Sequence, residues 1–283
     1  MKLNIGMRCH DLCPKMEMEA LFKEVKANGI HQIQLAFGKS VSNYDFSTGH
    51  YSPGFARYIR DELAKNEIHV AVLGCYINPT NPIEAKRREA VDRFIEHMKY
   101  ARILGADMVG TETGRLDADF QVTKESYTEE GYQLLLKSMR EIVDAAEKLG
   151  VIVGVEGVFN HTLYSPARMK RFLEDIHSPN VEVILDAVNL IHPDQVSPEA
   201  QKRVIDQAFA YYGDKISVLH VKDFVFEGEE QIFRHVGDGL FCYEPLMHHI
   251  KETKPHIAML LENSSRDRFQ GDAAFLQEIF DRV

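Results

Sequence analysis

The 283-residue sequence has no excess of positive charge, since 33 Lys and Arg stand against 43 Asp and Glu for a net charge of -10. Proteins that bind nucleic acid usually concentrate Lys and Arg on one surface to neutralise phosphates. The charge balance therefore argues against a nucleic-acid partner. A hydrophobic content of 45% is enough for one large core.

Cysteine is scarce, and the four cysteines (Cys9, Cys13, Cys75 and Cys242) form no Cys-x-x-Cys pair. Free thiols in a reducing compartment are therefore expected. No apolar run approaches the length of a membrane span, and the first residues, MKLNIGMRCHDL, predict a strand rather than a signal peptide. We expect a cytoplasmic protein that does not contact a membrane.

Two glycine-rich signatures are also missing. No GxGxxG follows the first predicted strand and no P-loop occurs, which disfavours a doubly wound nucleotide-binding fold. Neither a Ser/Gly-rich linker nor a shift in composition marks a domain boundary. A single domain over residues 1–283 is therefore expected.

What the chain does contain is a repeat of strand followed by helix. Several predicted helices end at a glycine that leads into the next strand, as at Gly105 and Gly150, and others begin at Ser-Pro, as at Ser52 and Ser165. Eight such units in roughly 280 residues predict an α/β protein built as one (β/α)8 TIM barrel. The segment from Asp223 to Phe241 is expected to be a long loop.

Four successive predicted strands, the fifth to the eighth, end in polar residues: Glu156, Asp186, His220 and Glu262. Strand alternation puts Ile152 and Gly154 on the face of Glu156, and Ile216 and Val218 on the face of His220. Because the carboxyl ends of barrel strands meet at one mouth, the four groups are expected to converge.

Three carboxylates this close would repel one another unless a cation neutralised them. Oxygen ligands with one imidazole suit Mn, Mg, Co or Zn, with positions left open for substrate oxygens. A single acid at a strand end is often only a helix cap or an ion-pair partner. Four in consecutive units favour a metal site.

The motifs VEGVFNH, LDAVNL, LHVKD and LLEN resemble the xylose isomerase-like superfamily of sugar isomerases and epimerases, which also includes inosose dehydratases and endonuclease IV. The resemblance runs from GMRCHD at the first strand to LLEN at the last. It implies that Glu156, Asp186, His220 and Glu262 hold one divalent metal ion, and that Glu156 and Glu262 are the catalytic acid and base.

The sequence departs from the ketose epimerase pattern at two places. Asn189 stands where many epimerases have a histidine, and no second acid follows Glu156 closely. Endonuclease IV has a histidine-rich three-metal site on a basic surface, which neither Asn189 nor the net charge supports.

Other polar residues follow predicted strands and are candidates for binding substrate: Arg8, His10, Glu112, His161, Lys222 and Arg234. A structural hydrogen-bonding role is the alternative for each of them. His97 falls on a predicted helix and is expected to be solvated.

The leading hypothesis is a metal-dependent isomerase or epimerase that acts on a small carbohydrate through an enediolate. An inosose-type dehydratase and a non-catalytic ligand-binding barrel are the alternatives. The sequence leaves the substrate, the metal and the oligomeric state open, a homo-oligomer included.

Overall fold

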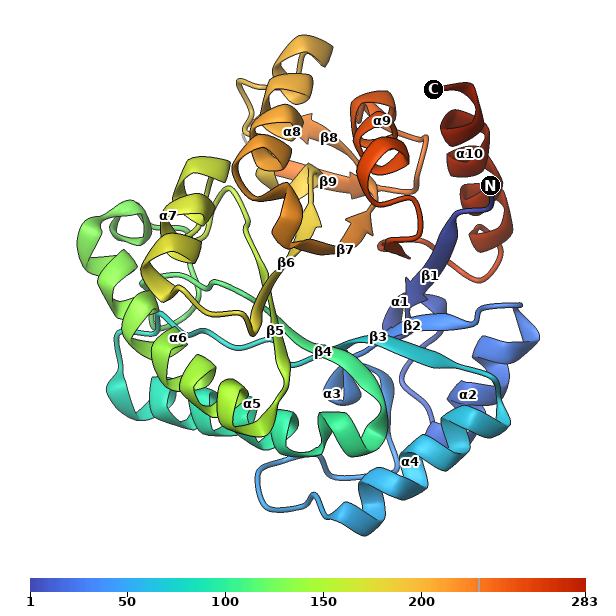
Figure 1. Cartoon of the computed structure of the whole chain (residues 1–283), viewed down its shortest axis with the longest axis vertical. Helices are drawn as coiled ribbons and strands as arrows, with labels where there is room; N and C mark the ends of the chain where they lie inside the picture. The colour runs from blue at the N-terminus through green and yellow to red at the C-terminus, as the bar shows by residue number, and fades with distance from the viewer. Residues whose placement is uncertain (229) are drawn as a thin grey trace.

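The computed structural model of the protein describes residues 1–228 and 230–283. Eight parallel strands close into a barrel in the order β1-β10-β7-β6-β5-β4-β3-β2, and helices surround it (Figure 1). The predicted (β/α)8 fold is thus confirmed. The barrel strands are β1 (Asn4–Arg8), β2 (Gln32–Leu35), β3 (His69–Gly74), β4 (Ala106–Glu112), β5 (Ile152–Glu156), β6 (Val181–Asp186), β7 (Ile216–Val221) and β10 (Ala258–Leu261).

The helices begin and end where local sequence signals place them. Ser52 and Ser165 cap helices that start with proline, and their hydroxyls accept from Phe55 N and Arg168 N. No helix in the described residues is long and apolar enough to cross a membrane. The α-helices are α1 (Cys9–Leu12), α2 (Met18–Ala27), α3 (Phe37–Ser40), α4 (Pro53–Lys65), α5 (Glu84–Leu104), α6 (Glu129–Leu149), α7 (Pro166–Ile176), α8 (Pro198–Tyr212), α9 (Tyr243–Thr253) and α10 (Phe269–Arg282), with 3-10 turns η1 (Lys124–Tyr127), η2 (Val188–Leu190) and η3 (Gly213–Lys215).

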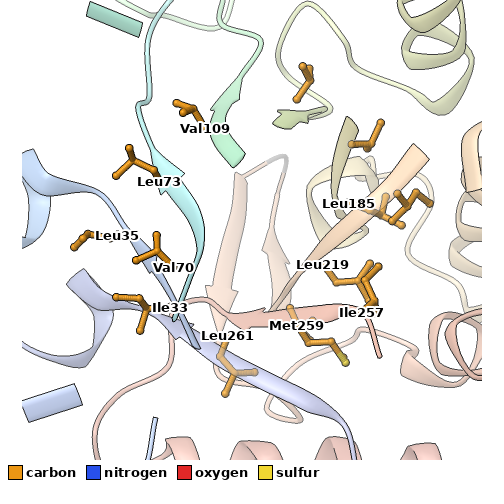
Figure 2. Close-up of a cluster of buried hydrophobic side chains, with 14 of the residues drawn as sticks. Ile33, Leu35, Val70, Leu73, Val109, Leu185, Leu219, Ile257, Met259 and Leu261 are labelled. Atoms are coloured by element: carbon orange, nitrogen blue, oxygen red, sulfur yellow. The ribbon is translucent and has the colours of Figure 1, made fainter. Parts of the chain in front are cut away.

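Strand alternation divides the core into two layers. Residues that point outward pack against the helices, and Figure 2 shows part of this layer, including Val109, Leu185 and Leu219. Residues that point inward fill the barrel, among them Ile184, Val218 and Leu260. The barrel interior is therefore packed, and any cavity for a ligand has to lie above it.

Ile216, which was expected to share the inner face with Val218, packs in the outer layer instead. The register between β6 and β7 shifts between Val183 and Ile184, so Val183 pairs with Ile216 while Ile184 pairs with Val218. A bulge of this kind adds one residue and changes the side to which the preceding side chain points. It leaves His220 on the inner face, where it pairs with Asp186.

The loop expected from Asp223 onward is in fact an antiparallel hairpin, β8 (Asp223–Glu227) and β9 (Glu230–Arg234). Asp223 anchors it from inside. One carboxylate oxygen accepts from Phe224 N and Phe241 N, both at 2.8 Å, and the other accepts from Gly237 N at 3.1 Å and Tyr243 Oη at 3.0 Å. This carboxylate therefore ties the hairpin and the chain that follows it to the end of β7.

Candidate active site

The four polar residues at the strand ends lie together at the carboxyl end of the barrel. Glu156 and Asp186 are the last residues of β5 and β6, His220 lies near the end of β7, and Glu262 directly follows β10. Each is at most 3% exposed. Buried charges need partners or a bound cation, so the contacts among these groups decide what the site can hold.

The His220 imidazole lies between the two glutamates. Its Nδ1 is 3.0 Å from Glu156 Oε2 and 3.1 Å from Glu262 Oε1. Donor atoms of Glu156, Asp186 and His220 all lie within 4.8 Å of one another. These three form a cluster that could hold a metal ion, and Glu262 adjoins it through His220.

Lys222, the residue directly after β7, reaches into the same cluster. Its Nζ is 2.6 Å from Asp186 Oδ2 and donates to Glu262 Oε2 at 2.8 Å. The side chain is 2% exposed, and its ammonium lies over the Phe233 ring of the hairpin at 4.2 Å. The structure thus places this predicted substrate-binding residue against two candidate metal ligands.

Arg8, at the end of β1, supplies a second positive charge. It donates to Asp11 at 2.7 Å through Nε, and its Nη1 is 3.0 Å from Glu262 Oε1. Burial alone would raise the pKa of Glu262, but Lys222, Arg8 and His220 together hold that pKa well below its usual range. Glu262 is therefore kept as a carboxylate.

Burial and the neighbouring charges also shift the pKa values of Asp186 and His220. Burial raises the pKa of Asp186 to about 6, although Lys222 opposes the shift. Burial also works against the charged form of His220, but the attraction of Glu156 and Glu262 outweighs it and raises the pKa of His220 to about 9. The carboxylates of this site lie close together, and the positive charges that pair with them come from Lys222 and Arg8.

The cluster fits a divalent cation on its own evidence. Among the described residues, Asp186 Oδ2 and both ring nitrogens of His220 are buried without a hydrogen bond of acceptable geometry. Buried polar atoms without a hydrogen bond are costly, and a cation bound to Asp186 Oδ2 and to a deprotonated nitrogen of His220 would satisfy them. Two carboxylates and an imidazole, with a third carboxylate beside them, are a donor set that Mn, Zn, Co and Mg accept.

Two further predicted residues line the space above the cluster. Glu112 ends β4 in register with Glu156, and its carboxylate is 3.7 Å from His161 Nδ1. Burial, reinforced by Glu156 and Glu262, raises the pKa of Glu112 to about 7. Burial, reinforced by Arg115, lowers the pKa of His161 to about 3, so His161 is neutral at ordinary pH.

A cavity of about 820 Å³ opens above these groups, and its wall includes Arg8, Glu112, His161 and Lys222. His10 and Arg234 do not contribute to this wall. His10 is partly buried beside Arg8 with its pKa lowered to about 4, chiefly by burial. Arg234, at the end of β9, donates to Phe233 O and approaches Glu227 at 3.9 Å.

Two residues that the sequence did not single out as site residues, Asn189 and Tyr76, also contact the cluster or adjoin it. Asn189 donates to Glu156 Oε1 at 2.7 Å, and its backbone N–H donates to Asp186 at 3.1 Å, so it links two candidate ligands. Tyr76, just past β3, hydrogen-bonds Gln34 of β2, and burial together with Glu156 and Glu262 raises its pKa. Their position just after a strand, or at its end, was the available signal.

Comparison with known proteins agrees with this architecture. The chain shares 24% identity over 185 residues with an inosose dehydratase of Histophilus somni (strain 129Pt), covering 58% of this chain and 60% of that protein. The match thus spans less than two thirds of that relative.

Solved structures share the fold at low identity. A 3-keto-D-glucoside 4-epimerase, YcjR, from E. coli superposes with a TM-score of 0.72 at 13% identity, covering 98% of this chain and 100% of that chain. An L-ribulose 3-epimerase gives 0.73 at 15%, covering 100% and 95%, and the IolI protein with a zinc atom gives 0.69 at 15%, covering 100% and 99%.

One family model, described as the xylose isomerase-like TIM barrel, matches residues 22–279. That range includes seven of the eight barrel strands and all four residues of the buried cluster. The chain therefore belongs to the xylose isomerase-like TIM barrel family.

Proposed function

We propose that this protein is a divalent-metal-dependent isomerase or epimerase that acts on a sugar or sugar derivative through an enediolate. The observation that carries the proposal is the buried meeting of Glu156, Asp186, His220 and Glu262 at the mouth of the barrel, where Asp186 Oδ2 and the His220 ring nitrogens lack a hydrogen bond of acceptable geometry. Glu156, Asp186, His220 and Glu262 would hold the ion. When bound, the ion would polarise two neighbouring oxygens of the sugar.

The chain's own residues supply the proton transfer. Lys222 and Arg8 keep Glu262 as a carboxylate, which is the form that a general base requires, although the same contacts lower its basicity. Asn189 orients Glu156, because it donates to Oε1 while Oε2 faces His220. The two glutamates come from strands separated in the barrel by β6 and β7. They are therefore suited to act on two sides of one sugar, as an isomerase or epimerase requires.

The relatives support this reading without identifying the substrate. The structural neighbours include epimerases of a keto-glucoside and of a ketose, and a protein with a zinc atom. One specific observation favours a second candidate, an inosose-type dehydratase, because the matched sequence relative carries that name. Both reactions begin by removing a proton from carbon and differ in whether a hydroxyl is then expelled.

The test begins with the metal content of the purified protein and continues with a sugar panel in deuterated water. An isomerase or epimerase incorporates deuterium at carbon with no change in composition, whereas a dehydratase product lacks one water by mass spectrometry. A protein that binds no divalent ion and exchanges no carbon-bound proton would contradict the proposal and favour a binding-only barrel.

Glu262→Gln then examines the proton-transfer role. The amide keeps the size of the side chain and one ligand oxygen but loses basicity, so most of the metal should be retained while turnover falls by ~10²–10⁴. Glu182→Gln is the control, since Glu182 belongs to β6 but bonds Ser217 at 2.7 Å near the opposite end of the strand. If Glu262→Gln exchanges the proton at near the wild-type rate, Glu262 is not the base.

A further inference from the structure

The cavity above the cluster has a polar floor and an apolar wall. Arg8, Glu112, Lys222 and Glu262 contribute to the floor, and the volume is about 820 Å³. Cavities of this volume are typical of sites that enclose a drug-sized ligand, and a single sugar ring is much smaller. The cavity therefore has room for a second group beyond the sugar.

Two cationic side chains of the floor, Lys222 and Arg8, are already paired with carboxylates of the protein. Lys222 lies between Asp186 and Glu262, and Arg8 between Asp11 and Glu262. Each of these two positive charges thus has a carboxylate on either side.

Arg115 is the third cation that lines the cavity. It donates to Asn160 O at 3.1 Å, to Asn160 Oδ1 at 2.8 Å and to Phe120 O at 2.7 Å. Glu112, Glu230 and Glu262 line the same space. Among the described residues that line the cavity, the three cations Arg8, Arg115 and Lys222 are matched by these three acids. The lining thus has no net positive charge to favour a phosphate or carboxylate, and the cavity suits an uncharged substrate.

The apolar wall is formed by side chains that remain exposed. Phe120 is 38% exposed, Val122 55% and Phe233 39%, and all three line the cavity. Exposed apolar groups gathered at one cavity usually mark a binding surface. Sugar hydroxyls gain little from such a wall, whereas an aryl or alkyl group would bury it.

The two phenylalanines are held in place rather than loosely attached. Phe120 has a φ of 63°, which is unusual for a bulky residue, and its ring lies 4.7 Å from the Arg115 guanidinium and 5.3 Å from His161. Phe233 packs over Lys222 and belongs to the hairpin that Asp223 anchors. The wall is thus built into the site before any ligand binds.

We infer that the substrate is an uncharged sugar carrying an apolar substituent, such as an aryl or alkyl glycoside that also has a keto group on its ring, since the enediolate needs a carbonyl beside the C–H that is deprotonated. The sugar lies on the polar floor and the substituent lies against Phe120, Val122 and Phe233. This inference rests on the proposed function and adds the substrate class.

The experiment compares phenyl and methyl glycosides of the same sugars, together with the free sugars and their phosphates, on the metal-loaded protein by isothermal titration and saturation-transfer NMR. Phenyl glycosides should bind at least about tenfold more tightly than methyl glycosides, because the ring buries apolar surface on both sides. Saturation should transfer to the phenyl protons. Sugar phosphates should bind more weakly than the free sugars.

Matched variants locate the substituent. Phe233→Ala, on the hairpin strand β9, and Val122→Ser, on the loop after β4, should each lower the phenyl-to-methyl affinity ratio toward one. Tyr211→Ala is the control: Tyr211 is 42% exposed on α8, does not line the cavity, and should leave the ratio unchanged. Val122→Ser lies outside the hairpin, so it still tests the inference if the hairpin fails to fold in Phe233→Ala.

Equal binding of phenyl and methyl glycosides, or preference for a sugar phosphate, would overturn the inference. A change of oligomeric state in Phe233→Ala with an unchanged affinity ratio would also overturn it, because a second copy of the chain would then cover the apolar wall. If these results came with intact metal binding and carbon-proton exchange on free sugars, the proposed function would stand and only the substrate class would fail.

Discussion

Lys222→Met is the perturbation that separates two roles for the buried ammonium. In one role Lys222 is a resident cation that competes with a metal ion for Asp186 and Glu262, whose oxygens lie 2.6 and 2.8 Å from Nζ. In the other, Lys222 positions these ligands for the ion. Removing the charge has opposite effects on metal affinity in the two cases.

The structure gives the expected size of the effect. An ion bound to Asp186 would stand about 5 Å from Nζ, where a double and a single charge repel by roughly 6–7 kcal/mol at an effective dielectric constant of about 20. Relaxation and entry of water will cancel most of this. We expect Lys222→Met to bind Zn²⁺ or Mn²⁺ about ten- to a hundredfold more tightly than the wild type.

The metal-free variant should be less stable, because Asp186 and Glu262 lose their buried partner. Loss of one member of a buried ion pair costs about 3–5 kcal/mol in the free energy of unfolding. Added metal should therefore stabilise the variant by more than it stabilises the wild type, since stabilisation grows with the ratio of free metal to dissociation constant.

The assay is isothermal titration of chelator-treated protein, with urea unfolding in the presence and absence of the metal. Lys254→Met is the control. Its ammonium donates to Asp214 O at 2.7 Å and Ile216 O at 2.6 Å, at the other end of β7. Equal or weaker metal binding by Lys222→Met would refute the reasoning and show that Lys222 positions the ligands.

Two further predictions concern stability. Asp223→Ala removes four hydrogen bonds at the hairpin and should lower the free energy of unfolding by about 3–5 kcal/mol. Tyr243→Phe removes only the bond from Tyr243 Oη and should lower it by about 1 kcal/mol. Equal urea midpoints for the wild type and Asp223→Ala would contradict the role of Asp223 as an anchor. Burial lowers the pKa of His97 to about 4. The unfolded chain, with a histidine pKa near 6.5, then binds more protons between the two values, so stability should fall by up to about 3 kcal/mol as pH decreases through that window. His97→Gln should flatten this decline in urea titrations at pH 7 and pH 4.5, and an unchanged slope would exclude His97 as its cause.

Most of the barrel could be predicted because its signals are local. Gly105 and Gly150 have φ values of 93° and 64°, the left-handed caps that end α5 and α6. The hairpin, where a loop was expected, also carries a local signal, since short apolar runs, residues 224–226 and 232–233, lie on either side of Gly228.

The sequence predicts which polar residues stand at the strand ends, but not which of them contact one another. Alternation put Lys222 on the face of His220, but its pairing with Asp186 and Glu262 depends on three strands meeting in space. His97 was expected to be solvated and is instead 5% exposed. Tyr51, from the loop before α4, packs against it, with its hydroxyl 3.1 Å from His97 Nε2. A contact 46 residues away in the chain has no signal in the helix itself.

The closure of the barrel between β1 and β10 has a consequence for synthesis of the chain. Asn4 of β1 pairs with Ala258 of β10. One edge of β1 therefore stays unpaired until the ribosome has synthesised β10, about 10–50 s later. During this interval the nascent chain exposes an unpaired strand edge, and it lacks Glu262. All four candidate metal ligands are therefore present only late in synthesis, and chaperone protection of the first strand should matter most during elongation.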